Sequence, residues 1–134
     1  MDNDVHCSEE EVVSLVHAFY ARVRQDEVLG PIFNTRITDW DHHLAKLVDF
    51  WSAILRRTAR FSGAPMPKHA ALPGLSMELF ERWLGLFDAT LADQPNRAMA
   101  EQASQAARRI AQSLWAGYQM SREPNALPEI IAHV

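Results

Sequence analysis

The sequence predicts an all-α protein, and three observations support this prediction. Apolar residues recur at helical spacing along four long stretches. A residue suited to capping a helix stands at or near the start of each stretch. No stretch shows the alternation of apolar and polar residues that is typical of strands. The predicted starts lie near Ser8, at Thr38 or Asp39, near Ser76 and at Asn96.

Length and charge narrow the class of protein. The chain has 134 residues, which predicts one domain over 1–134, with a helical core over about 8–120 and an irregular tail over 121–134. The formal net charge is −4. The chain contains no basic run and no basic stripe interleaved with aromatic residues, so we expect no nucleic-acid partner.

The cysteine content and the N-terminal sequence indicate the compartment. Cys7 is the only cysteine, which excludes an internal disulfide and a secreted disulfide scaffold. The acidic start at 1–4 leads into no apolar block, so no signal peptide is expected. No apolar run reaches the roughly 20 residues that span a bilayer. We therefore expect a cytoplasmic protein without a membrane partner.

The first helix is expected to begin at a capping box, in which Ser8 and Glu11 each satisfy a backbone N–H of the other. Tyr20 lies at the edge of the apolar stripe that follows. A buried tyrosine must place its hydroxyl against a partner or a polar cavity. The alternative is a core aromatic residue whose hydroxyl reaches solvent. The stripe itself consists of Val12, Leu15, Val16, Phe19 and Val23.

The second long helix follows a short connecting segment, where Gly30 is expected to end the first helix and Pro31 to open a short one. His43 falls on the apolar face of this long helix, while His42 is expected to face water. His43 is then either a ligand contact or a histidine at the core edge satisfied by a backbone group. The apolar face is expected to hold Trp40, His43, Leu44, Leu47, Phe50, Trp51, Ile54 and Leu55.

A proline-bounded segment over 64–73 carries His69. Its three prolines limit regular helix to about one or two turns. His69 is either a ligand to a bound group or a histidine in a surface loop. Three arginines end the preceding helix, where positive charge is favourable and where they could also pair with an anionic ligand group. They are Arg56, Arg57 and Arg60.

The third and fourth long helices complete the predicted core. Trp83 lies on the apolar face of the third helix, and its indole N–H needs an acceptor if it is buried. Trp83 is then either a core residue or a donor into a pocket. The third-helix stripe is Leu79, Phe80, Trp83, Leu84, Phe87 and Leu91. The fourth helix, over about 97–120, is expected to turn Ala103, Ala107, Ile110, Ala111, Leu114 and Tyr118 inward.

Helices of this kind form either an antiparallel bundle or a globin-like packing. Two features favour the globin-like packing. The short segment with His69 lies between two long helices. Three polar side chains, Tyr20, His43 and Trp83, are placed on the apolar faces of three different helices. Each would be costly to bury alone, but together they suit one polar ligand in an apolar pocket.

The sequence resembles the group III truncated haemoglobins. The resemblance runs from about Ser8 to Tyr118, and the chain lacks the paired glycines that groups I and II carry before the proximal histidine. The matching positions are Phe19-Tyr20, 29–33, Trp40 with His43, Phe50-Trp51, 63–65 leading to Lys68-His69, Leu72-Pro73, Phe80, Trp83-Leu84 and Leu86-Phe87.

The resemblance implies a two-over-two helical sandwich around haem b. His69 would be the proximal ligand of the iron. Tyr20, His43 and Trp83 would form the polar distal site, with His43 at its mouth, and Phe33 and Leu47 would contact the haem. The resemblance does not distinguish whether His43 gates entry or binds ferric iron. The candidates for contact with the haem propionates are Lys68, Arg56, Arg57 and Arg60.

The expected function is reversible binding of dioxygen and related small ligands, including oxygen transport. The first alternative is a haem enzyme that acts as a nitric oxide dioxygenase or a peroxidase. Because the chain carries no flavin or nicotinamide domain, a dioxygenase would need a separate reductase. The second alternative is a helical interaction domain without a cofactor. Burial of His69 together with three polar distal residues disfavours it.

Overall fold

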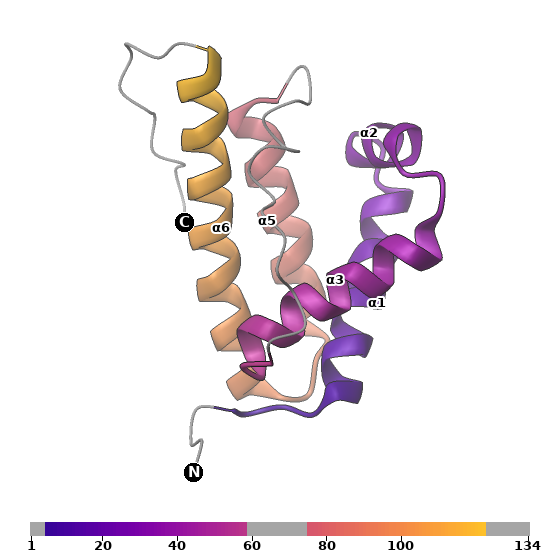
Figure 1. The fold of residues 1–134 in the computed structure, drawn as a ribbon, viewed down its shortest axis with the longest axis vertical. Helices are drawn as coiled ribbons and strands as arrows, with labels where there is room; N and C mark the ends of the chain where they lie inside the picture. Colours follow the sequence, from indigo (N-terminus) through magenta and orange to yellow (C-terminus); the bar gives the residue numbers. More distant parts are fainter. Residues whose placement is uncertain (1–4, 59–74, 123–134) are drawn as a thin grey trace.

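The computed structural model describes residues 5–58 and 75–122, and within this part of the chain every regular element is a helix. The all-α prediction is confirmed there. Figure 1 shows the arrangement of the helices. They are α1 (Glu9–Gln25), α2 (Leu29–Arg36), α3 (Trp40–Leu55), α5 (Met77–Ala92) and α6 (Arg97–Arg122).

Four side chains cap the long helices, as their sequence predicts. Each accepts a hydrogen bond from the backbone N–H three residues later, and this satisfies one of the unpaired donors of the first turn. The capping residues are Ser8, Asp39, Ser76 and Asn96. At Ser8 the capping box is complete, because the Glu11 carboxylate accepts from the Ser8 N–H at 2.9 Å.

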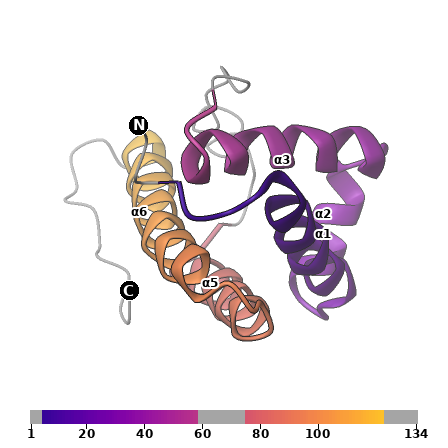
Figure 2. The ribbon, with the colours of Figure 1, turned by 90° about the horizontal axis from the view of Figure 1, so that it is seen from below.

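The long helices pack as two pairs. Helix α1 packs against α3, and α5 runs antiparallel to α6, while α1 also contacts α5 and α3 contacts α6 (Figures 1 and 2). Aromatic rings fill the space where α1, α3 and α5 meet. The ring centroid of Phe87 lies 4.8 Å from that of Phe19 and 5.2 Å from that of Trp51. The predicted stripe of α1 is fully buried in this core.

The end of α1 was predicted wrongly. The helix ends at Gln25, not at Gly30, and Gly30 lies inside the first turn of α2. Asp26 takes an extended conformation, and its carboxylate accepts hydrogen bonds from the Val28 and Leu29 N–H groups. Because that carboxylate satisfies donors at the start of α2, the chain turns at Asp26.

The close approach of α1 and α2 explains the glycine at position 30. A Cβ on Gly30 would lie 2.6 Å from the Arg24 carbonyl oxygen, whereas a Cβ on Gly85 in α5 would meet nothing within 4 Å. We expect Gly30→Ala to destabilise the protein by roughly 1–3 kcal/mol through backbone overlap. Gly85→Ala should stabilise it by about 0.5–1 kcal/mol, because alanine favours helix over glycine. Urea unfolding of both variants measures the difference, and equal shifts would contradict the close approach.

The C-terminal end of α3 also departs from expectation. The helix ends at Leu55, so neither Arg56 nor Arg57 lies in its last turn. Arg57 has a φ of 58°, a left-handed conformation in which glycine is the usual residue.

In α6, Trp115 is buried although the predicted stripe omitted it. Among the residues described, no helix combines the length and apolar character needed to cross a bilayer.

Candidate functional site

Tyr20 lies on α1 with only 5% of its surface exposed. Aromatic rings from three elements surround it. Its ring centroid lies 4.7 Å from Phe19, 6.2 Å from Phe33 on α2 and 6.3 Å from Trp40 on α3. The hydroxyl is therefore held in a largely apolar environment. Of the two alternatives for this residue, a hydroxyl that reaches solvent does not fit the observed burial.

The burial of Tyr20 determines its ionisation state. Desolvation raises the pKa of the phenol well above its usual value, and the nearby Trp83 indole N–H opposes part of that rise. The hydroxyl therefore keeps its proton at neutral pH. An indole N–H can only donate, so Trp83 is the donor and the Tyr20 oxygen the acceptor. The phenolic hydrogen then remains available for a further acceptor.

Trp83 reaches this position from α5. Its ring meets Phe19 edge-on at 5.3 Å and stacks on Phe87 at 5.7 Å with an interplanar angle of 2°. These two contacts fix the indole plane, and aromatic pairs of this geometry add to the stability gained by burial. Sequence analysis did not predict the contact between Phe19 and Trp83. The two residues lie on different helices, and no local sequence pattern connects them.

His43 lies on α3 and is half-buried. Its ring packs edge-on against Trp40, with centroids 5.7 Å apart. The polar end of Trp40 is directed elsewhere, because its indole N–H donates to the Asn34 side chain at 3.1 Å. The structure therefore packs Tyr20 and Trp83 against the same Phe19 ring and places His43 beside Trp40, which itself contacts Tyr20.

Two helices carry a second apolar stripe besides the one in the core. Consecutive helix residues point about 100° apart, so positions four, seven and eleven residues on share a face. On α3 the second stripe is His43, Leu47, Phe50 and Ile54, all half-buried. On α5 it is Leu79, Trp83 and Leu86, also half-buried.

These stripes fit the predicted haem. A flat apolar ring system bound against them would remove apolar surface from water, which is favourable in proportion to its area. Two of the predicted distal residues, His43 and Trp83, lie on the stripes themselves, and the predicted haem contact Leu47 does so too. Phe33, the other predicted haem contact, lies on α2 beside Tyr20. The described residues thus provide both the apolar surface and the polar donors that a haem pocket requires.

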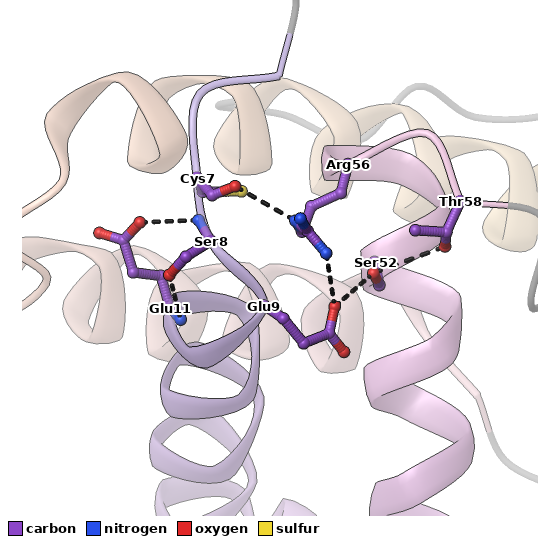
Figure 3. Close-up of polar contacts among 7 residues, drawn as sticks. All are labelled: Cys7, Ser8, Glu9, Glu11, Ser52, Arg56 and Thr58. Carbon is purple, nitrogen blue, oxygen red and sulfur yellow. Dashed lines mark hydrogen bonds and ion pairs between the residues drawn. The ribbon is translucent and has the colours of Figure 1, made fainter.

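The predicted proximal ligand, His69, lies outside the described residues, as do Lys68 and Arg60. Of the remaining propionate candidates, Arg56 has protein partners. Its guanidinium donates to the Cys7 carbonyl at 3.2 Å and to the Glu9 carboxylate at 3.1 Å (Figure 3). The same Glu9 oxygen accepts from the buried Ser52 hydroxyl at 2.9 Å. This network ties the end of α3 to the start of α1.

A separate hollow of about 300 Å³ opens between α1 and α2. It is lined by Ala21, Arg24, Gln25 and Asn34, and none of these is a predicted site residue. The Arg24 guanidinium lies over the Trp40 ring, 4.6 Å from its centroid. Three of its four lining side chains are polar and all four residues are exposed, so it lacks the apolar lining of a haem pocket.

Comparison with known proteins shows the family of the chain. The bacterial-like globin family matches residues 5–115 of the chain. The group 3 truncated haemoglobin ctb of Campylobacter jejuni is 38% identical over a region covering 78% of this chain and 85% of that protein. The crystal structure of the group III truncated haemoglobin from Campylobacter jejuni superposes with a TM-score of 0.77 at 35% identity, covering 90% of this chain and 95% of that one.

These matches make the helical fold that of a haem-binding globin. The chain belongs to the bacterial-like globins, and within them to the group III truncated haemoglobins. The predicted family and the predicted truncated-globin fold are confirmed.

Proposed function

We propose that this globin, built as one domain around haem b, binds dioxygen at a distal site made by Tyr20, Trp83 and His43. His69 would hold the haem iron, and the haem would supply the capacity to bind a diatomic ligand. The protein supplies the hydrogen bonds that hold such a ligand. Phe33 and Leu47 provide apolar contacts to the ring.

The observation that supports this proposal is that the buried Tyr20 hydroxyl and the Trp83 indole lie together inside an aromatic enclosure, both against Phe19. Because an indole N–H can only donate, the phenolic hydrogen stays free to donate to a bound ligand. Dioxygen acquires partial negative charge on binding, and a hydrogen bond to a charged acceptor contributes roughly 1.5–3 kcal/mol. Carbon monoxide acquires little charge and gains much less. The pair therefore favours dioxygen over carbon monoxide.

His43 has a different role in this proposal. It lies on the half-buried stripe of α3 and is more exposed than Tyr20. The resemblance to the family implies a position at the mouth of the distal site. We therefore assign it to ligand entry, with Tyr20 and Trp83 controlling escape.

A comparison of two ligands tests the proposal. In the double variant Tyr20→Phe/Trp83→Phe, the dioxygen dissociation rate should rise steeply. The carbon monoxide dissociation rate should change by less than roughly threefold, because the removed donors act on charge. Stopped-flow ligand replacement measures both rates. An equal rise for the two ligands would mean that the aromatic pair acts by shape alone and would contradict the proposal.

A further inference from the structure

An ion pair outside the candidate distal site binds the turn of α5 that also carries Trp83. The Arg82 guanidinium donates two hydrogen bonds to the Asp26 carboxylate, from Nε at 2.6 Å and from Nη2 at 2.9 Å. The Asp26 side chain is 8% exposed, whereas that of Arg82 is 43% exposed. Parallel bonds of this kind fix the guanidinium in orientation as well as in position.

Asp26 is itself held firmly by the corner between α1 and α2. Its carboxylate accepts from the Val28 and Leu29 N–H groups at 3.1 and 2.9 Å. Its backbone carbonyl accepts from the Gly30 N–H at 2.9 Å, and its own N–H donates to the Val23 carbonyl. The carboxylate cannot move away without uncapping α2. Arg82 is therefore bound to a carboxylate whose position is fixed.

The ion pair and the indole contact act on adjacent residues. Arg82 and Trp83 are consecutive on α5, so their side chains point about 100° apart around the helix axis. On the other side, Tyr20 lies six residues before Asp26, about 9 Å along α1 at the usual helical rise. Two contacts in different directions restrict both sliding and rotation of this turn of α5 against α1.

We propose that the Asp26–Arg82 ion pair positions the Trp83 indole against the Tyr20 hydroxyl and thereby sets how firmly the distal pair holds a ligand. This inference rests on the function proposed above. The Asp26–Arg82 ion pair persists at neutral pH. Hydrogen bonds from Arg82, Leu29 and Val28 lower the pKa of Asp26 to about 2, so the carboxylate stays ionised at neutral pH.

A second ion pair between the same helices provides a matched control. Arg22 on α1 pairs with Asp93 at the C-terminal end of α5, with side chains 37% and 65% exposed. Exposed ion pairs contribute little to stability. Loss of the Arg22–Asp93 pair should therefore cost little stability, whereas loss of the Asp26–Arg82 pair should cost more, because Asp26 is far less exposed than Asp93. Only the pair beside Trp83 should affect the distal site.

The test uses haem-loaded Arg82→Gln, Arg82→Lys and Arg22→Gln, as carbon monoxide complexes for NMR and as dioxygen complexes for kinetics. The first readout is the indole N–H resonance of Trp83 in ¹H–¹⁵N NMR spectra, assigned by its loss in Trp83→Phe. The second is the dioxygen dissociation rate. We expect Arg82→Gln to shift the resonance and raise the rate roughly threefold to tenfold, as coupled neighbours do. Arg82→Lys keeps the charge without the paired bonds, so its effects should be smaller. Arg22→Gln should leave both readouts unchanged.

Combining variants separates positioning from general loosening. If Arg82 acts through the indole, adding Arg82→Gln to Trp83→Phe should change the rate little further. Full additivity of the two effects would overturn the inference, as would a wild-type resonance and rate in Arg82→Gln. An unchanged rate in Trp83→Phe alone would contradict the proposed function instead. The resonance would then decide by itself whether the ion pair positions the indole.

Discussion

Replacing His69 with alanine is expected to abolish stable haem binding. The resemblance to the group III truncated haemoglobins predicts His69 as the proximal ligand of the iron. The described residues provide apolar stripes on α3 and α5 and distal donors, but an apolar surface alone holds haem weakly without a bond to the iron. Haem stoichiometry, measured as the ratio of Soret to protein absorbance after gel filtration, should fall close to zero.

Two controls make this result interpretable. His17→Ala alters an exposed residue on α1 and should keep the full haem content. Imidazole added to His69→Ala should restore part of the haem spectrum if the vacated place is the ligand site. Wild-type stoichiometry and an unaltered spectrum in His69→Ala would refute the assignment of His69.

The second large effect is expected at the distal pair. Tyr20→Phe removes the phenolic donor and keeps the ring, whereas Trp83→Phe removes the indole N–H and leaves a smaller aromatic ring. Tyr20→Phe should raise the dioxygen dissociation rate roughly tenfold to a hundredfold, which corresponds to one charge-assisted hydrogen bond. Trp83→Phe should raise it as well, but the two effects should not add in full, because the indole and the phenol lie together and act as one unit.

Matched substitutions elsewhere test whether these changes are specific. Trp115→Phe removes an indole and Tyr118→Phe a hydroxyl, both on α6, which carries none of the predicted distal residues. Both should leave the dissociation rate within about twofold of the wild type, the scale of indirect effects. Unchanged rates in both Tyr20→Phe and Trp83→Phe would remove the donor pair from the account.

Much of the fold could be predicted because its determinants are local. Capping residues such as Ser8 and Asp39 bond to groups three residues away. The apolar stripes follow directly from helical periodicity. The end of α1 was predicted wrongly because Gly30 resembled a helix stop, whereas its absent side chain serves the approach to Arg24. That reason depends on how α2 packs, which no local pattern reveals.

The candidate site could be predicted only in part for the same reason. Helical periodicity placed Tyr20 and Trp83 on apolar faces, but their proximity depends on how α1 and α5 pack. Asp26 and Arg82 are 56 residues apart in the chain, and no local pattern pairs them. Arg56 looked free to bind a propionate, although it pairs with Glu9 on another helix. Contacts between distant helices require the tertiary structure.

The most direct test of the haem-binding account is the absorption spectrum of the purified wild-type protein, recorded oxidised, reduced and under carbon monoxide. The account predicts a Soret band at one haem per chain that shifts on reduction and again on addition of carbon monoxide. It also predicts that protein isolated without cofactor regains this spectrum when an equal amount of haemin is added. Absence of a Soret band after that addition would contradict the account.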